Sequence, residues 1–216
     1  MTPAEWPLFG LELTTSRLVL RPPTDDDFPA LLEAIDAGIH DPSYMPFSSP
    51  WTERPRDERA QSALQFWWRT RATWTSDDWQ LVLAVFHQGR AVGVQEIMGK
   101  QFLQLREVTT GSWLTQAVQG QGLGKEMRAA ALAFAFGHLG AQVARSDAYD
   151  DNPRSLGVSR GLGYRDNGTS RHLLGDGVKT LVNLEMTAAE WVQVADRWPT
   201  TVSGFGACQG MFGLDG

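Results

Sequence analysis

The sequence predicts an α/β protein of mixed α+β character, with helices on both faces of a central, mostly antiparallel mixed sheet. Two observations lead to this fold class. Short apolar segments separated by tight turns are typical of antiparallel hairpins. A strand, a helix and a second strand in mid-chain are typical of a βαβ unit. The 216 residues are expected to form one domain, 1–216, with a core at about 13–186 and a C-terminal helix and tail at 187–216.

The N-terminal elements follow from local patterns. Residues 13–22 are a predicted strand, because Leu18 and Leu20 alternate with less apolar positions. Thr24 precedes three aspartates, which is typical of a helix N-cap followed by first-turn carboxylates, and Gly38 is expected to end that helix.

The next segments alternate between irregular and periodic patterns. Residues 40–55 hold four prolines and three aromatic residues, so we expect an ordered loop there. The remaining predicted elements are, in order, a helix at 55–73, strands at 79–87 and 91–98 joined by a turn, a strand at 107–115, a helix at 125–138, a strand at 142–149, a short helix at 153–160, and strands at 164–174 and 179–186. The glycine-rich tail beyond Trp198 shows no pattern to which a role can be assigned.

Composition narrows the function classes. The net charge of -6 argues against a protein that tracks nucleic-acid phosphates, and it is compatible with a cationic or amine-bearing substrate. Cys208 is the only cysteine, so neither an internal disulfide nor a thiolate zinc cluster is expected. The sequence has no pattern of a secretion signal or a membrane span, so we expect a cytoplasmic protein without a membrane partner. No histidines and carboxylates stand at metal-ligand spacing, so no metal site is predicted.

The strongest functional pattern is the segment Gln119-Gly120-Gln121-Gly122-Leu123-Gly124-Lys125, between a predicted strand and a predicted amphipathic helix. Its alternating glycines let the backbone turn tightly and approach a ligand. The free N–H groups and the dipole of the following helix suit a phosphate or pyrophosphate. The spacing fits neither the dinucleotide pattern G-x-G-x-x-G nor the Walker loop G-x-x-x-x-G-K-[ST]. A ligand bearing another kind of diphosphate and a turn without any ligand both stay open.

Four ordered blocks carry a family resemblance. They are Leu13-x-Thr15-x-Arg17-Leu18-x-Leu20-Arg21-Pro22 with Asp26-Asp27, Gly111-Ser112-Trp113-Leu114, Gln119-x-x-Gly122-x-Gly124, and Asn152-x-x-Ser155 with Gly163-Tyr164. The third block resembles the Q/R-x-x-G-x-G/A signature with which the GNAT superfamily cradles the pyrophosphate of coenzyme A. The others resemble its ribosomal-protein N-terminal acetyltransferase-like branch. The resemblance implies the GNAT fold, with a sheet that splays at the cofactor site.

The resemblance also implies which residues hold acyl-CoA. The strand that carries Trp113 and Leu114 would pair with the pantetheine arm, Asn152 and Ser155 would lie near the thiol, and Arg160 would reach the ribose phosphate. An exposed arginine that is simply solvated is the alternative for Arg160. The expected cofactor contacts are Trp113, Leu114, Gln119, Gly120, Gln121, Gly122, Leu123, Gly124, Lys125, Asn152, Ser155 and Arg160.

In such an enzyme a neutral amine attacks the thioester directly, which requires a proton acceptor and a donor for the leaving thiolate. Glu96 and Glu107, on predicted strands, are the candidate general bases; a water molecule, with both glutamates facing the surface, is the alternative. Many relatives donate a proton from a tyrosine, and counting along the motif places Ser159 at that position. Ser155 or Ser159 could relay a proton instead, and Ser155 is the candidate catalytic donor because it also matches the motif. The alternative is that both serines cap a helix or face solvent.

The loop at 40–55 and the second helix are expected to cover the acceptor side. Its residues His40, Tyr44, Met45, Phe47 and Trp51 are the candidates for shaping an acyl or amine pocket. The alternative is that these aromatic residues form core or a contact in a homo-oligomer.

The resemblance predicts transfer of an acyl group, acetyl by default, from acyl-CoA to a primary amine. Succinyl-CoA is an alternative donor, because the loop at 40–55 is longer than in minimal family members, and a cation in the acyl cavity would favour it. A non-catalytic acyl-CoA-binding module is a further alternative. The acceptor is a protein N-terminus, a lysine or a small molecule.

Overall fold

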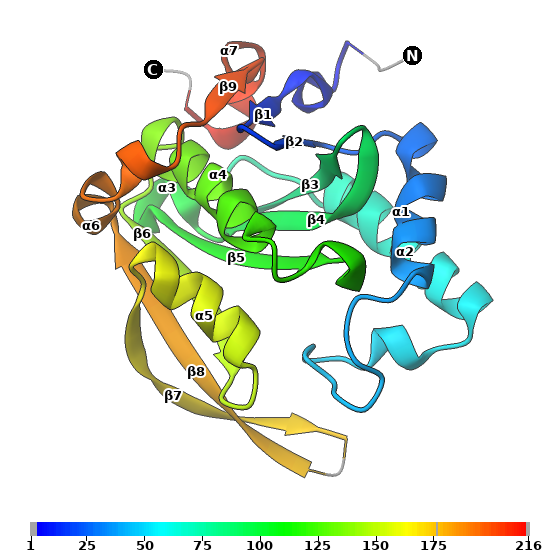
Figure 1. Ribbon diagram of the computed structural model, residues 1–216. Coiled ribbons are helices and arrows are strands. Elements are labelled where there is room, and N and C mark those ends of the chain that lie inside the picture. Colours follow the sequence, from blue (N-terminus) through cyan, green and yellow to red (C-terminus); the bar gives the residue numbers. More distant parts are fainter. Residues whose placement is uncertain (1–3, 176, 215–216) are drawn as a thin grey trace.

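The computed structural model describes residues 4–175 and 177–214, and in these ranges nine strands form one open sheet. Its spatial order is β7-β8-β6-β5-β4-β3-β2-β1-β9 (Figure 1). The strands are β1 (Glu12–Thr14), β2 (Leu18–Arg21), β3 (Trp79–His87), β4 (Arg90–Gly99), β5 (Glu107–Leu114), β6 (Val143–Tyr149), β7 (Arg165–Leu174), β8 (Gly177–Thr187) and β9 (Thr201–Ser203). The α-helices are α1 (Phe28–Asp36), α2 (Arg56–Ala72), α3 (Phe102–Leu105), α4 (Leu123–Gly137), α5 (Pro153–Leu162), α6 (Ala188–Val192) and α7 (Phe205–Cys208). This open mixed sheet, flanked by helices, confirms the predicted fold class.

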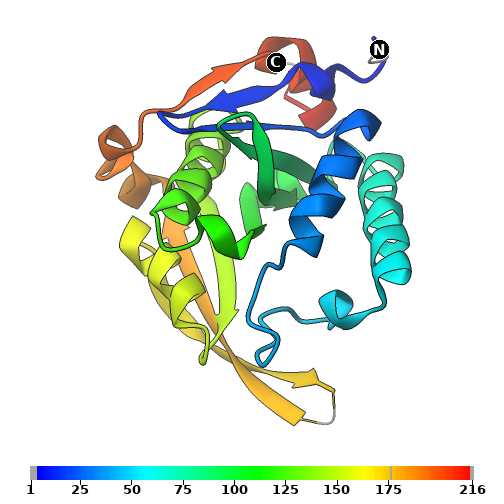
Figure 2. The ribbon, with the colours of Figure 1, turned by 45° about the vertical axis from the view of Figure 1, so that its right-hand side comes forward.

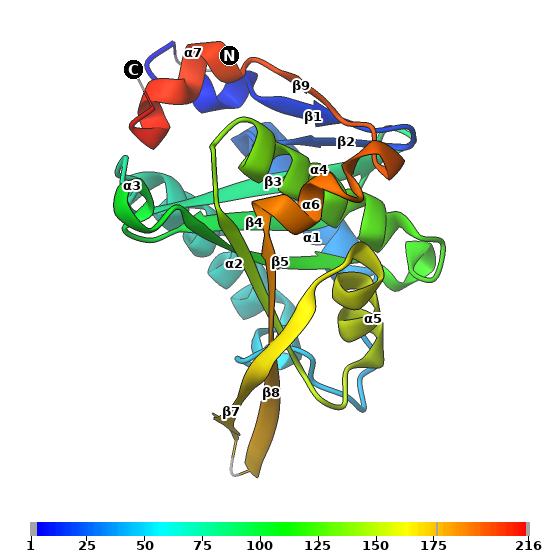
Figure 3. The same ribbon diagram turned by 90° about the vertical axis from the view of Figure 1, so that its left-hand side faces the viewer.

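The sheet opens between its two central strands. Among the described residues, β5 and β6 form the one parallel pair, and their register ends where Thr109 lies opposite Arg145. The strands then part, so that the second half of β5 has no strand beside it on the β6 side. Figure 3 shows β7 and β8 continuing as a long hairpin beyond the body of the sheet. The sheet therefore leaves a backbone edge free in its interior, as the resemblance implies.

Helices cover the two faces through separate apolar cores. On one face α4, with Leu132 and Phe134 fully buried, packs against the inward residues of β3 and β4. Helices α1 and α2 lie on the other face (Figure 2). They pack through Phe28 and Trp67, whose stacked rings have centroids 4.7 Å apart. Because strand side chains alternate between faces, each strand serves both cores.

The predicted strand at 13–22 is wrong in one respect, because the structure contains two short strands there. β1 and β2 pair as an antiparallel hairpin, with Leu13 opposite Leu20. The turn between them is held by side chains distant in sequence, since Thr15 and Ser16 donate hydrogen bonds to the Glu126 carboxylate of α4. Local alternation cannot reveal that tertiary contact.

The other predicted elements lie close to their observed bounds. Thr24 and Asp27 form the expected capping box, although a 3-10 turn at Asp25–Asp27 precedes α1. Helix α4 begins at Leu123, within the glycine segment, two residues earlier than predicted. Helix α3 is short and was not predicted. It lies between Gln101 and Arg106, which both have positive φ.

The C-terminal tail belongs to the core. Strand β9 pairs with β1, placing Leu13 opposite Val202 at the edge of the sheet. Cys208 and Phe212 are fully buried. Gly204 has φ +74°, and a Cβ there would collide with the carbonyl of Gly10, so only glycine fits this close approach. The tail therefore completes the β1 side of the sheet.

Candidate active site

A cleft of about 1570 Å³ opens where β5 and β6 part. The residues that line it come from the glycine segment with α4, from the start of α5, and from the loop between α1 and α2. Of the sequence-predicted residues, the structure brings these to the cleft: His40, Tyr44, Phe47, Trp51, Glu96, Trp113, Leu114, Gln119, Gly120, Gly122, Gly124, Lys125, Asn152 and Ser155. It does not bring these to the lining: Met45, Glu107, Gln121, Leu123 and Arg160.

The glycine segment presents free backbone donors to the cleft. Gly120 and Gly122 have φ +76° and +82°, a left-handed conformation that glycine adopts without a steric penalty. The N–H groups of Lys125 and Glu126 bond to the Gly122 carbonyl. The amides of Leu123 and Gly124, at the first helical positions, have no partner within the helix. These amides, together with the helix dipole, can bind an anion.

Gln119 organises this segment through its side chain. Its Nε2 donates to the carbonyls of Ile39 and Leu114, both at 2.8 Å, and its Oε1 accepts from Arg154 Nη1 at 3.0 Å. Both the nitrogen and the oxygen of the Gln119 amide therefore form hydrogen bonds with other protein groups. Gln119 therefore positions the segment, while Arg154, which sequence reasoning missed, supplies a positive charge at the cleft.

Lys125 crosses from α4 to α5. A Cβ at Gly161 would lie 2.6 Å from Lys125 Cε, so the lysine chain occupies the space that this glycine leaves. The ammonium group therefore lies against α5 at Gly161. Arg160 instead forms an exposed ion pair with Asp166 at 2.8 Å.

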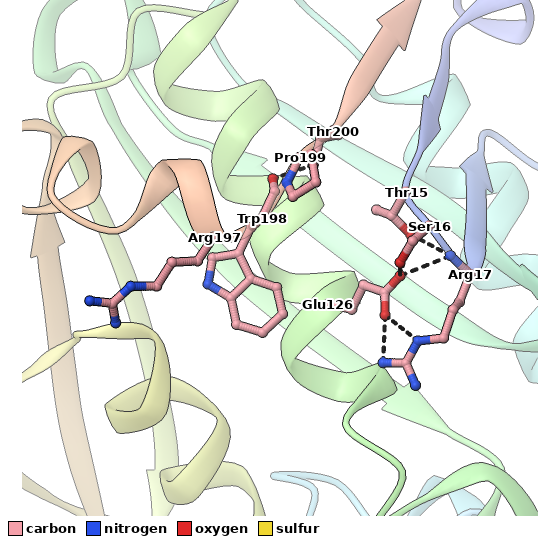
Figure 4. A pocket seen from close by; sticks show the side chains of 8 residues that line it. All are labelled: Thr15, Ser16, Arg17, Glu126, Arg197, Trp198, Pro199 and Thr200. Carbon is pink, nitrogen blue, oxygen red and sulfur yellow. Dashed lines mark hydrogen bonds and ion pairs between the residues drawn. The ribbon is translucent and has the colours of Figure 1, made fainter.

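Glu126 fixes the start of α4 against the β1–β2 turn (Figure 4). Its carboxylate accepts from Thr15, Ser16 and the Arg17 backbone, and it forms an ion pair with Arg17 at 2.6 Å. Arg17 also donates to the Gln121 carbonyl at 2.9 Å. A separate pocket of about 220 Å³ lies beside this cluster, bordered by Trp198 (Figure 4).

Glu96 lies on β4, opposite Gly111 of β5, and both residues line the cleft. The carboxylate accepts a hydrogen bond from Gln80 Nε2 at 2.8 Å. Desolvation raises the pKa of Glu96, and the Gln80 hydrogen bond only partly opposes this. Gly111 lies opposite Glu96 and leaves the carboxylate uncovered, because a Cβ there would approach Glu96 Oε2 to 3.7 Å. A carboxyl with a raised pKa in a cleft is suited to accept a proton near neutral pH.

Glu107 has a different environment. It forms two hydrogen bonds with Arg145, both at 2.9 Å, and these lower the pKa of its carboxyl. It lies at the paired start of β5, where the strands have not yet parted. Its surroundings are those of a structural ion pair.

The start of α5 also borders the cleft. Asn152 is the N-cap of α5, and its Oδ1 accepts the Ser155 N–H at 3.1 Å. Ser155 is half-buried and lines the cleft. Ser159 is 1% exposed and its hydroxyl has no hydrogen-bond partner. Since Ser159 does not border the cleft, it cannot take the place of the tyrosine found in relatives.

The loop at 40–55 reaches across the cleft to the opposite wall. Tyr44 donates to Asp151 Oδ1 and Lys179 donates to Asp151 Oδ2, both at 2.8 Å. The Lys179 ammonium lies 4.7 Å from the Tyr44 ring centroid and 5.0 Å from that of Tyr149. Desolvation and Asp151 raise the pKa of Tyr44, so its hydroxyl remains a donor. This cluster joins the loop to β8 and encloses the cleft.

The loop's other residues divide into two groups. Phe47 lies between His40 and Trp51, with ring centroids 5.7 Å and 5.4 Å away, and all three rings border the cleft. Met45 is turned away from it, and its sulfur accepts a weak contact from Thr52 at 3.9 Å.

Sequence reasoning missed two charged residues in the cleft, Arg128 of α4 and Asp147 of β6. Desolvation raises the pKa of Asp147, and the nearby Arg128 and His172 partly oppose this. Arg128 lies within the apolar pattern of α4 and had no local signal. In the described part of the chain, no group of three or more His, Cys, Asp or Glu could hold a metal ion, and no helix is long and apolar enough to cross a membrane.

Comparison with known proteins identifies this arrangement. The sequence model described as "Acetyltransferase (GNAT) domain" matches residues 17–165. Among solved structures, RimJ of Mycobacterium smegmatis in complex with CoA-disulfide is similar, with 21% identity, a TM-score of 0.68, and coverage of 92% of this chain and 100% of that chain.

Two further structures share the fold. RimL, a ribosomal α-N-protein acetyltransferase in complex with coenzyme A, has 16% identity and a TM-score of 0.66, covering 80% of this chain and 95% of that one. A chimera of spermidine N-acetyltransferase SpeG from Vibrio cholerae and hSSAT has 14% identity and a TM-score of 0.66, and the match covers 82% of this chain and 99% of that one. At these identities the likeness establishes the fold, and the presence of RimJ and RimL agrees with the predicted branch.

Proposed function

The chain belongs to the GNAT acetyltransferase family, and we propose that it transfers an acyl group from acyl-CoA to a primary amine by direct attack on the thioester. The observation that supports this most strongly is the juxtaposition of an anion-binding helix start with a splayed sheet in one cleft. The first suits a diphosphate. The second offers a free strand edge to an extended arm that carries amide groups.

The cofactor's diphosphate would lie on the amides that open α4. Gly120 and Gly122 allow the backbone to approach it, and Lys125 and Arg154 would neutralise its charge. Gln119 holds both Arg154 and the segment in place. Arg160 forms an ion pair with Asp166 and lies outside the cleft lining, so we do not propose it as a contact of the cofactor.

The pantetheine arm would extend along the free edge of β5. Trp113 and Leu114 border the cleft on this strand. Asn152 and Ser155 border it from α5, on the opposite side of the arm. A backbone N–H of β5 would polarise the thioester carbonyl, as in an oxyanion hole.

Glu96 is the proposed general base. It accepts a proton from the attacking ammonium group, directly or through one water, and the neutral nitrogen bonds to the thioester carbon. The carbon–sulfur bond then breaks while the nitrogen loses its second proton, and Ser155 relays that proton to the leaving thiolate. The raised pKa of Glu96 supports this role, because a base whose pKa approaches the working pH transfers protons efficiently.

The cleft favours a cationic acceptor. Glu96, Asp147 and Asp151 all border it and carry negative charge when ionised. RimL acts on a ribosomal protein α-amine and SpeG on spermidine, as their names state. A protein N-terminus, a lysine or a polyamine is therefore the acceptor class that we propose. The acetyl group is the simplest donor group, and succinyl is the alternative.

Calorimetry with coenzyme A tests the cofactor site. Gly122→Asp places a carboxylate where the diphosphate would lie, and we expect it to weaken CoA binding at least about 100-fold. Gly140→Asp is the control, since Gly140 also has positive φ (+69°) but lies away from the cleft; a Cβ at Gly140 would meet nothing within 4 Å, whereas one at Gly122 would lie 3.5 Å from Arg17 Nη2. If the intact chain has no CoA affinity and Gly122→Asp makes no difference, the proposal fails.

Thiol release from acyl-CoA, measured with a panel of amines and N-terminal peptides, tests turnover. We expect release that depends on the amine. Binding of CoA without turnover across a broad panel would instead favour a non-catalytic acyl-CoA-binding module.

A further inference from the structure

Arg128 is a buried cation that forms no ion pair with a described residue, although its charge acts on the nearby Asp147 of β6. Arg128 is 4% exposed. Its Nη1 donates to Ser146 Oγ at 2.9 Å and its Nη2 donates to Ser112 Oγ at 3.0 Å, while its Nε has no partner. Within the described residues, no carboxylate forms an ion pair with it. Burying an arginine without a counter-charge is costly, so its retention inside an open cleft calls for a ligand that supplies the missing charge.

The guanidinium bridges the opening of the sheet. Ser112 lies on β5, three positions beyond the last residue paired with β6, and Ser146 lies on β6, one position beyond. Both hydroxyls accept from Arg128, so each keeps its own O–H to donate. Arg128 and Ser112 border the cleft, whereas the buried Ser146 does not, so the Ser112 hydroxyl and the guanidinium N–H groups are the donors at this point of the cleft. This is the donor set that a carboxylate accepts best.

This point lies beyond the diphosphate site, in the direction of the acyl end. Arg128 follows Gly122 by six residues on α4, which is about 9 Å along the helix. The pantetheine arm enters the splay from the start of α4. A group at the end of the arm would therefore lie deeper in the splay than the diphosphate, near Arg128.

The two faces of the splayed sheet carry opposite charges. Ser146 faces α4, so the next residue, Asp147, faces the other side. Ser112 faces α4, so its neighbour Gly111 faces the other side of the sheet. Glu96 lies opposite Gly111 and therefore also points away from α4. The acceptor side thus carries carboxylates and the α4 side carries Arg128. An anionic acyl group and a cationic amine would each meet the complementary charge.

We propose that Arg128, held in place by Ser146 and assisted by the Ser112 hydroxyl, binds the terminal carboxylate of an acyl group derived from a dicarboxylic acid. The preferred donor is then a carboxyacyl-CoA such as succinyl-CoA. This inference rests on the proposed function, because it assumes that acyl-CoA occupies the cleft. It selects one of the donor classes that the sequence left open.

The test compares two stable thioethers, S-carboxypropyl-CoA and S-butyl-CoA, which differ in the terminal carboxylate and cannot transfer an acyl group. Calorimetry gives the affinity of each for the intact chain and for Arg128→Met, which keeps the side chain's length without its charge. Arg90→Met is the control, because Arg90 is exposed at the β3–β4 turn. Ser112→Ala removes one hydroxyl and leaves the arginine.

We expect the intact chain to bind the carboxylate thioether more tightly, and Arg128→Met to reduce the ratio of the two affinities about 10–100-fold. Ser112→Ala should reduce it less, and Arg90→Met should not change it. A ratio within one variant cancels any general loss of folding or CoA affinity. If free CoA binds but the intact chain does not prefer the carboxylate, or Arg128→Met leaves the ratio unchanged, this inference fails and the proposed function stands. If neither thioether nor CoA binds, both fail.

Discussion

Removal of the Glu126 carboxylate should detach the β1–β2 turn from the start of α4. In Glu126→Gln, the remaining carbonyl oxygen can keep the three hydrogen bonds from Thr15, Ser16 and the Arg17 backbone that now reach Oε1. What is lost is the ion pair with Arg17, whose side chain is 43% exposed against 7% for Glu126. A half-exposed pair contributes about 1 kcal/mol.

Glu126→Ala removes every acceptor. Three donors then lose their partner at about 1 kcal/mol each, in addition to the ion pair, which gives about 4 kcal/mol. For a chain of this length, 1 kcal/mol lowers the melting temperature by about 2–4 °C. Thermal unfolding followed by circular dichroism should therefore show a fall of about 2–4 °C for Glu126→Gln and about 8–16 °C for Glu126→Ala. Glu58→Gln, an exposed first-turn carboxylate on α2, is the control.

The pH dependence tests the same reasoning. Hydrogen bonds from Thr15 and Arg17 outweigh desolvation and lower the pKa of folded Glu126 below that of an unfolded glutamate, about 4.3. The carboxylate's contribution to stability is then complete above that value and is lost as the pH falls through the folded pKa. The difference in unfolding free energy between the intact chain and Glu126→Ala should therefore become smaller below about pH 4. This account would be refuted if Glu126→Ala lost less than about 1 kcal/mol of unfolding free energy at neutral pH, or if its difference from the intact chain grew in acid.

Three further outcomes are expected. Glu96→Gln should lower kcat by about 100-fold or more and abolish the acidic limb of the pH profile of kcat/KM. In the intact enzyme this limb should lie above the ordinary pKa of a glutamate, because desolvation raises the pKa of Glu96. An unchanged limb in the variant would exclude Glu96 as the base. Gly161→Ala should displace the flexible Lys125 side chain, leaving the melting temperature nearly unchanged while weakening CoA binding several-fold by calorimetry; unchanged affinity would remove Lys125 from the site. Gly204→Ala should lower stability in urea by more than 2 kcal/mol, because its Cβ meets the Gly10 backbone at positive φ; a neutral result would show that the tail is not docked as described.

The backbone conformation of the glycine segment could be predicted because its signal is local. A glycine-rich segment before an amphipathic helix predicts its own backbone conformation, and Gly120 and Gly122 adopt the positive φ that only such residues favour. The short helix predicted at 153–160 is likewise present as α5, with Asn152 as its N-cap. The sequence also placed Glu96 on a strand facing a cleft, but it could not separate Glu96 from Glu107.

The separation of the two glutamates depends on neighbours that are distant in the chain. Glu107 is paired with Arg145 and Glu96 is uncovered beside Gly111, and only strand register produces these environments. Arg128 is the clearest case. In the sequence it is one charged residue within the apolar pattern of α4, and a solvated position would be the ordinary expectation.

The sequence by itself determined the fold class, most element positions and the glycine-rich start of α4, because periodicity, capping and glycine conformation act over a few residues. The tertiary structure alone decided which charges share the cleft, where the tail docks, and that Arg128 is buried between Ser112 and Ser146. The physical reason is that the burial and pairing of a charge depend on which strands lie side by side, and that is settled only when the whole sheet has formed.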